Sequence, residues 1–246
     1  MPKFFVEPSK ISDDIITVDT EDVNHITRVL RMKPGDKVTV CDSAGYDYTA
    51  EIFEINKSSV LCKIINKIRS DTEPRLNVIL FQGIPKGSKM EYIIQKTTEL
   101  GISKIIPVCM HRCVSKIENK KDGDKKRDRW QKIAESAAKQ SGRGIIPEIG
   151  TPVSFGEAVD ALLECELAFA PFECEEENSI KNVIKGIQGN KTVGFIIGPE
   201  GGFAPEEIEK LTKKGIPAVT LGKRILRTET AGEAVVAMLM YEANEL

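Results

Sequence analysis

Residues 193–202 read Val-Gly-Phe-Ile-Ile-Gly-Pro-Glu-Gly-Gly, and the chain continues as Phe-Ala-Pro-Glu-Glu-Ile over 203–208. The apolar run at 193–197 is bounded by glycine, which predicts a short buried strand. Pro205 followed by two carboxylates is typical of a helix start, because proline needs no amide partner there and the helix dipole favours acids. The stretch therefore predicts a strand, a glycine loop and a helix. Ligands of open α/β sheets bind at the carboxyl ends of strands, where this loop lies.

The glycine loop at 198–202 differs from the phosphate-binding motifs. It matches neither G-x-G-x-x-G nor G-x-x-x-x-G-K-[ST], and Glu200 within it would repel a phosphate. A neutral or cationic ligand is therefore favoured over a nucleotide phosphate. The alternative is a tight structural turn without a ligand, and the loop alone does not separate the two.

A second stretch, Val-Thr-Leu-Gly-Lys-Arg-Ile-Leu-Arg-Thr-Glu-Thr-Ala at 219–231, repeats the order of strand, loop and helix. Gly222 begins the predicted turn, and Thr228 or Thr230 can cap the last helix. Two glycine loops at the ends of two strands predict a cleft between them.

Together, Gly198-Pro-Glu-Gly-Gly-Phe and Leu221-Gly-Lys-Arg-Ile-Leu-Arg-Thr-Glu-Thr-Ala resemble the RsmE family, and the resemblance covers nearly the whole chain. Its members are 16S rRNA (uracil(1498)-N3)-methyltransferases of the SPOUT, or α/β-knot, superfamily. The resemblance implies a small PUA-like β-barrel at 1–70 for RNA recruitment. It also implies an α/β, Rossmann-like methyltransferase domain with a trefoil knot at 74–246. The implied methyl donor is S-adenosyl-L-methionine (SAM), the implied partner is 16S rRNA in the small ribosomal subunit, and the implied assembly is a homodimer.

The resemblance places the cofactor on the two glycine loops and on the strand end near residue 171. Backbone groups of the loops can hold the adenine edge, while Leu221, Ile225 and Leu226 can form an apolar wall. The implied cofactor-binding residues are Pro171, Phe172, Ile197, Gly198, Glu200, Gly201, Gly202, Leu221, Gly222, Ile225, Leu226, Thr230 and Ala231.

Uridine N3 carries a proton at neutral pH, so its methylation requires that this proton be removed or displaced. A carboxylate acting as a base, or a guanidinium that stabilises the uridine anion, would serve. Arg227 and Glu229 flank Thr228 in the second loop and are the candidate catalytic pair. A structural salt bridge between them is the alternative, and the group that takes the proton stays open.

Composition excludes several classes of protein. The chain has 246 residues, of which 41% are hydrophobic and 29% charged, and its formal net charge is −2. This is ordinary for a globular protein, so an RNA site requires local clusters of lysine and arginine.

No apolar run approaches the roughly 20 residues that span a bilayer. No signal-peptide core opens the chain, so we expect a cytoplasmic protein without membrane contact. Because there is no secretory signal, we expect the six cysteines to be reduced thiols. The Cys109-Met-His-Arg-Cys113 cluster lacks a second ligand pair, so we expect no metal there.

Period-two alternation predicts half-buried strands at 38–40, 46–52 and 60–64, after a helix over 23–31 with Val23, Ile26 and Leu30 on one face. A polar linker over 66–75 ends this part. From residue 76 strands and helices alternate, which predicts a parallel sheet covered on both faces. The charged segment 116–129 is expected to be a solvated loop, although its lysines and arginines outnumber its aspartates.

The last predicted helix carries apolar residues beyond one stripe, with Val236 and Met240 beside Val235 and Leu239. A second apolar face needs a covering surface, which agrees with the implied homodimer.

Several cations are candidates for RNA contact. Arg28 and Arg31 lie three residues apart on the predicted helix, so they share a face that either binds phosphates or is merely solvated. Lys3 stands where the family usually has arginine, and it keeps the charge but loses the bidentate geometry. Other cations lie beside strand ends or glycines near the cleft. The expected RNA-binding residues are Lys3, Arg28, Arg31, Lys86, Lys89, Arg112, Arg143 and Arg224.

Two other functions compete with uridine N3 methylation. Ribose 2′-O-methyltransferases of the SpoU type share a glycine-glutamate loop, but their last motif centres on Ser-Leu-Asn, where this chain reads Arg227-Thr-Glu-Thr. A non-catalytic rRNA-binding assembly factor would leave both glycine loops without a purpose.

Overall fold

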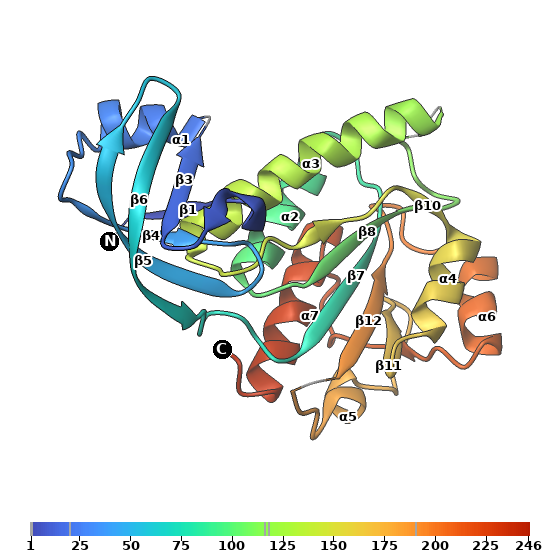
Figure 1. Cartoon of the computed structure of the whole chain (residues 1–246). Coiled ribbons are helices and arrows are strands. Elements are labelled where there is room, and N and C mark those ends of the chain that lie inside the picture. The colour runs from blue at the N-terminus through green and yellow to red at the C-terminus, as the bar shows by residue number, and fades with distance from the viewer. Residues whose placement is uncertain (1, 20, 116, 118, 190) are drawn as a thin grey trace. The chain divides into compact units, whose positions relative to one another are not determined.

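The computed structural model describes residues 2–19, 21–115, 117, 119–189 and 191–246. Contacts divide the chain into two compact units, Met1–Glu73 with Ala138–Ile146, and Pro74–Ala137 with Pro147–Leu246. Figure 1 draws the amino-terminal part of the first unit in blue and cyan, its segment 138–146 in yellow-green, and most of the second unit from green to red. Within the described ranges, every helix is too short or too polar to cross a membrane.

The first unit is built on a six-stranded sheet in the order β1-β4-β5-β6-β3-β2. Strands β1 and β4 are parallel, and the other neighbours are antiparallel. The alternation seen in the sequence is confirmed, because Val38, Val40, Ala50, Ile52 and Val60 are buried in one core. The strands are β1 (Lys3–Phe5), β2 (Ile11–Ser12), β3 (Ile15–Asp19), β4 (Lys37–Cys41), β5 (Tyr46–Ile55) and β6 (Ser59–Arg69).

The main helical segment of the first unit begins and ends two residues earlier than the sequence pattern predicts. A 3-10 turn η1 (Pro8–Lys10) precedes one α-helical turn, α1 (Glu21–Asn24), which continues as the π-helical segment η2 (His25–Val29). Val23 and Ile26 are buried as expected, but Leu30 is 39% exposed. The expectation that Arg28 and Arg31 share a helix face is wrong, because the helix ends at Val29 and Arg31 has a φ of 54°.

A distant segment of sequence completes the first unit. Ala138 and Ile146 pack on Phe5 and Cys41. The Arg143 guanidinium lies 2.7 Å from Glu73, whose other oxygen accepts the amide of Gly144 at 2.7 Å. This segment was not part of the amino-terminal domain expected from the sequence, because nothing in its pattern indicates which unit it packs on.

The second unit carries a parallel seven-stranded sheet in the order β10-β8-β7-β12-β11-β13, with β9 paired to β8. The apolar run 193–197 is a buried strand, as predicted: it forms β12 in the centre of this sheet and pairs with β7 and β11. The strands are β7 (Asn77–Gly83), β8 (Lys104–Cys109), β9 (Glu148–Ile149), β10 (Val153–Ser154), β11 (Leu167–Pro171), β12 (Thr192–Ile197) and β13 (Ala218–Val219).

Helices cover both faces of this sheet, which confirms the expectation. Helices α4 (Phe155–Leu163) and α6 (Pro205–Lys213) pack on one face, and α2 (Lys89–Glu99) and α7 (Thr228–Glu242) lie on the other (Figure 1). A short helix, α5 (Ile180–Ile184), follows β11. After β13, at the edge of the sheet, the chain crosses back over β11 and β12 to place α7 against α2, β7 and β12.

Two expectations about this unit are wrong. Segment 120–129 is not a loop but the start of the long helix α3 (Lys120–Ser141), because Asn119 caps it by accepting the Asp122 amide at 3.0 Å. Residues 116 and 118 of the expected loop lie outside the described residues. Val235, Val236, Leu239 and Met240 are at most 1% exposed within this single chain. Those four residues therefore need no second subunit to cover them.

Candidate functional site

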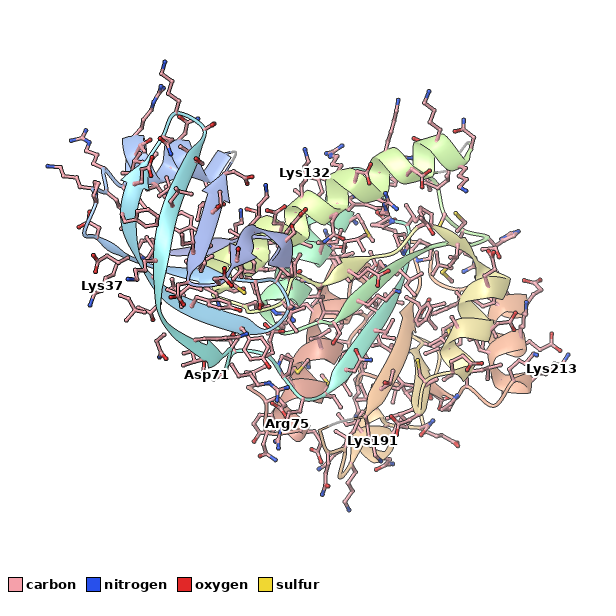
Figure 2. The ribbon with its side chains drawn as sticks, viewed as in Figure 1. Lys37, Asp71, Arg75, Lys132, Lys191 and Lys213 are labelled. Atoms are coloured by element: carbon pink, nitrogen blue, oxygen red, sulfur yellow. The ribbon has the colours of Figure 1, made fainter. Side chains whose placement is uncertain are left out.

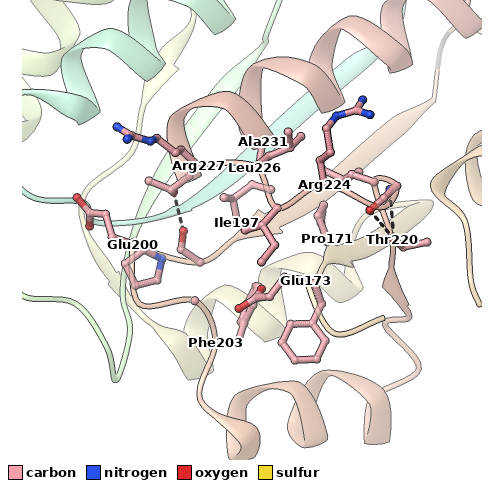
Figure 3. A pocket seen from close by; sticks show the side chains of 18 of the residues that line it. Pro171, Glu173, Ile197, Glu200, Phe203, Thr220, Arg224, Leu226, Arg227 and Ala231 are labelled. Atoms are coloured by element: carbon pink, nitrogen blue, oxygen red, sulfur yellow. Dashed lines mark hydrogen bonds between the residues drawn. The ribbon is translucent and has the colours of Figure 1, made fainter. Parts of the chain in front are cut away.

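The two glycine loops form one cavity of about 380 Å³ at the carboxyl ends of β11 and β12. We call it the loop cavity (Figure 3). Its wall consists of the strand end 171–173, the first loop at 197–200 and 202–203, the second loop 220–228, and two residues of α2 and α7, Lys89 and Ala231. The cleft predicted from the two sequence stretches is therefore present.

The first loop is both a tight turn and a cavity wall, so the two interpretations left open by its sequence coexist. Gly202 has a φ of 66°, and its amide donates to Pro199 O at 2.9 Å. A Cβ on Gly198 would lie 3.0 Å from the carbonyl carbon of Gly202. Only glycine fits this close approach of backbone to backbone.

A buried hydrogen-bond chain joins the first loop to α7 and β7. The Thr228 hydroxyl donates to Gly198 O at 2.6 Å and accepts from the Gln82 side-chain amide at 2.9 Å. Thr228 is 7% exposed and Gln82 is fully buried. Neither threonine caps α7 as expected, because Arg227 is the N-cap residue and Thr228 turns inward instead. Gln82 was missed, and its only signal was a polar residue that ends the apolar run 76–81.

Charged side chains of three elements meet beside the cavity. The Lys89 ammonium lies 3.2 Å from Glu200 Oε1 and 3.4 Å from Glu229 Oε2. The amide of Lys86 also donates to Glu200, at 3.0 Å. The hydrogen bond to Glu200 raises the pKa of Lys89 above its ordinary value. Partial burial acts to raise the pKa of Glu200, but backbone hydrogen bonds and Lys89 outweigh it and hold that pKa below its ordinary value.

The two candidate catalytic residues are separated by the structure. Arg227 is exposed and lines the cavity, on the same side as Glu200 in Figure 3. Glu229 does not line it among the described residues, and its carboxylate lies beside Lys89 instead. The alternative of a salt bridge between Arg227 and Glu229 is therefore replaced by an ion pair between Lys89 and Glu229.

Most residues expected to bind a cofactor lie around the cavity. Two do not line it among the described residues, Thr230, which is exposed, and Gly201, whose Cβ position faces Arg112 Cβ at 3.0 Å. Glu173, Phe203 and Thr220 also line the cavity, although the sequence patterns did not predict them. The expected residues on the wall are Pro171, Phe172, Ile197, Gly198, Glu200, Gly202, Leu221, Gly222, Ile225, Leu226 and Ala231.

The expected RNA-binding cations fall into two groups. Lys86 and Arg224 in the second unit, and Arg28 and Arg31 in the first, have exposed side chains. The others are engaged within the protein: Lys89 bridges two carboxylates, and Arg112 donates to Gly201 O at 2.8 Å.

Lys3 and Arg143 are structural residues of the first unit. The Lys3 ammonium is paired with Asp47 at 2.9 Å and donates to Gly142 O, and its side chain is 13% exposed. Arg143 is 4% exposed and paired with Glu73. The sequence predicted that both residues contact RNA at the surface, but a largely buried, paired cation presents no charge to RNA.

Comparison with known proteins identifies the family. A family model described as an RNA methyltransferase domain matches residues 72–240, and one described as an RNA methyltransferase PUA domain matches 18–65. Ribosomal RNA small subunit methyltransferase E of Bacillus subtilis is 33% identical over 100% of this chain and 98% of its own length. The protein of that name from Buchnera aphidicola (Schizaphis graminum) is 32% identical over 100% of this chain and 98% of its own.

Solved structures agree with this. The crystal structure of ribosomal RNA small subunit methyltransferase E from Neisseria gonorrhoeae bound to S-adenosyl methionine is 31% identical, with a TM-score of 0.86 over 99% of this chain and 98% of that one. A methyltransferase from Legionella pneumophila in complex with SAM is 30% identical, with a TM-score of 0.86 over 98% of both chains. The predicted fold class, an α/β SPOUT-type domain preceded by a PUA-like barrel, is confirmed, as is the prediction of an rRNA methyltransferase. The chain belongs to the ribosomal RNA small subunit methyltransferase E family.

Proposed function

We propose that the chain transfers the methyl group of SAM to N3 of one uridine, position 1498, of 16S rRNA in the small ribosomal subunit. The observation that carries this proposal is the loop cavity with Arg227 on its wall. A cationic side chain at this place suits a base whose ring becomes anionic, and the chain has Arg227-Thr-Glu-Thr where ribose methyltransferases of the SpoU type have Ser-Leu-Asn.

The chemistry of the cavity wall fits SAM. Gly198, Gly202 and Gly222 leave backbone uncovered for hydrogen bonds to an adenine edge. Ile197, Leu226 and Ala231 supply apolar contacts. Glu173 and Glu200 put carboxylates on the same wall, and a carboxylate favours the positive charge of a sulfonium. SAM, when bound, supplies an activated methyl group.

In the reaction, the bond between carbon and sulfur breaks as the bond between carbon and N3 forms, and the N3 proton leaves. Glu200 is a poor acceptor for that proton, because its pKa is held below the ordinary value. We assign to Arg227 the stabilisation of the uridine anion, which eases loss of the proton to solvent. Glu229 acts through Lys89, which it helps to hold beside the first loop.

The experiment that tests this function is nucleoside analysis of small-subunit rRNA after reaction with the purified protein and SAM. We expect 3-methyluridine at a single position. A 2′-O-methylated nucleoside would instead support the SpoU-type reaction, and absence of any product would support a non-catalytic assembly factor.

We also propose that the first unit recruits rRNA through Arg28 and Arg31. Both side chains are exposed and belong to the segment that precedes β4. Reversing both charges should weaken rRNA binding, increasingly so at low salt, without changing SAM affinity. The matched control reverses Lys33 and Lys37, two other exposed cations of that unit. Equal losses in both double variants would show a general charge effect and no site.

The homodimer and the cytoplasmic location rest on the family resemblance. Ile225, which is 82% exposed beside the cavity, and Tyr241 on α7, which is 76% exposed, supply apolar surface for a second copy. Sedimentation that finds a stable monomer at micromolar concentration would contradict the dimer.

A further inference from the structure

The first half of α3 is the most basic stretch of the chain. Residues 120–132 hold seven lysines and arginines and three aspartates, a net charge of +4 in a chain of net charge −2. In a solvated loop such charges would be spread over many conformations. In a helix each charged side chain leaves the axis in a defined direction, so the charges that share one face can be identified.

Ion pairs remove some of these charges and leave others. Lys126 pairs with Asp122 at 2.9 Å, Arg127 pairs with Asp128 at 2.6 Å, and Arg129 pairs with Glu91 of α2. Lys121, Lys125 and Lys132 are exposed, and among the described residues no hydrogen bond or ion pair engages their ammonium groups. Asp122 and Asp128 are thus paired with neighbouring cations, and these three lysines have no ion-pair partner among the described residues.

The three unpaired lysines share one face of the helix. At about 100° per residue, positions 121, 125 and 132 fall within roughly 40° around the axis, and at 1.5 Å per residue they span about 16 Å. Lys132 projects from α3 in Figure 2. The opposite side of the helix packs into the protein interior, because Trp130 is 7% exposed and Ala134 is fully buried. We call Lys121, Lys125 and Lys132 the α3 basic face.

The α3 basic face begins at the edge of the sheet that bears the loop cavity. Helix α3 follows β8, and β8 and β12 are parallel strands of one sheet, so their carboxyl ends lie at the same edge. The connection between β8 and α3 contains Arg112, which donates to the carbonyl of Gly201 in the first loop. A polyanion whose base enters the cavity therefore extends toward the first turns of α3.

Resting on the proposed function, we propose that the α3 basic face binds the phosphate backbone of the substrate rRNA beside the target uridine. The face is a row of unpaired lysines on one side of a helix, and rRNA supplies the complementary row of phosphates. Each lysine neutralises about one phosphate and releases its counterions, so the contact contributes affinity and salt dependence but no sequence preference.

The test is equilibrium binding of small-subunit rRNA from about 50 to 200 mM salt. The variant carries Lys121→Gln, Lys125→Gln and Lys132→Gln. Three lost phosphate contacts should reduce the slope of log K against log salt by about 2 to 3. SAM affinity and thermal unfolding should stay as in the wild type, because these side chains are exposed and unpaired.

The matched control carries Lys185→Gln, Lys191→Gln and Lys214→Gln, three exposed lysines at the opposite edge of the same sheet (Figure 2 labels Lys191). An unchanged slope in the α3 variant, or an equal change in the control, would overturn the inference. So would a loss seen only with assembled subunits and not with free rRNA, which would indicate a protein contact. These outcomes are independent of the proposed function, which is judged by the methylated nucleoside that the wild type produces.

Discussion

Lys89 bridges two carboxylates from different elements, with its ammonium 3.2 Å from Glu200 Oε1 and 3.4 Å from Glu229 Oε2. It thereby joins α2 to the first loop and to the first turn of α7. Removing the charge with Lys89→Met should loosen that loop and weaken SAM binding in the absence of RNA. We expect a loss of less than about tenfold, because the pair is partly exposed.

The control for this prediction is Lys86→Met. Lys86 holds Glu200 through its backbone amide, so its side chain can change without loss of that hydrogen bond. Calorimetry should therefore show normal SAM affinity for Lys86→Met. Normal SAM affinity in Lys89→Met as well would show that the ion pairs of Lys89 do not support SAM binding.

The pH dependence of this bridge follows from the two shifted groups. The pKa of Glu200 is lowered, so its contribution to stability is present above the ordinary value of 4.5 and is lost as pH falls through the folded-state pKa. The pKa of Lys89 is raised, so its contribution is complete below the ordinary value of 10.5 and is lost as pH rises through the folded-state pKa. Titration of the wild type should show SAM affinity unchanged by this bridge across the neutral range. A midpoint near pH 7 that disappears in Lys89→Met would contradict this.

Ala231 gives a direct test of where the cofactor lies. It is 8% exposed and lines the cavity from α7, so Ala231→Leu places extra atoms in the cavity within a helix that tolerates leucine. SAM affinity should fall about 10- to 100-fold. The control Thr230→Leu changes the neighbouring, exposed position, which does not line the cavity among the described residues. If Thr230→Leu lowers SAM affinity more than Ala231→Leu does, SAM does not bind in the loop cavity.

Thr228→Val tests the buried link between the first loop and α7. The variant removes the donor to Gly198 O at 2.6 Å and one of two acceptors of the Gln82 side-chain amide, which keeps its bond to Gly83 O. We expect a loss of about 1–3 kcal/mol in the free energy of unfolding, measured by denaturant titration. Thr230→Val, an exposed threonine two residues away, should change it by about 0.5 kcal/mol or less.

The hydrogen-bond chain also predicts that the stability losses caused by changing Thr228 and Gln82 are coupled. In the double variant with Gln82→Leu, the loss should be smaller than the sum of the two single losses, because both remove the same hydrogen bond. Strict additivity would show that the chain of hydrogen bonds does not act as a unit.

Local sequence signals predicted the elements around the site well. The apolar run of β12, the glycine loop and the helix start at Pro205 all have short-range causes, and each is present. The start of α3 also had a local signal, Asn119 before Asp122, but the dense charges of the segment suggested a loop. The crossing of the chain from β13 back to α7 has no periodic signature, so only the family resemblance could indicate a knot.

The partners of charged side chains could not be predicted, because they come from distant parts of the chain. Arg143 looks like a surface cation in sequence, yet it is 4% exposed and paired with Glu73, 70 residues away. The sequence likewise predicts that Lys89 is free for RNA, but the first loop and α7 bring carboxylates to it. The charge of a residue is readable from sequence, whereas its neutralisation depends on tertiary packing.

Arg227 is the residue on which the choice of acceptor depends. It is the N-cap residue of α7 but makes no capping bond with its side chain, so Arg227→Ala should leave the helix and the fold intact. If its guanidinium stabilises the uridine anion, the charge matters more in the transition state than in the ground state. Loss of such a contact should lower kcat by about 10²–10³ with little change in SAM affinity. Raising the pH toward the pKa of uridine N3 should partly restore the rate, because the anion then forms without help.

Arg224→Ala, which removes another exposed arginine of the same cavity, should show no such pH rescue. A variant of Arg227 whose sole defect is SAM binding, at every pH, would show that this residue only shapes the cavity.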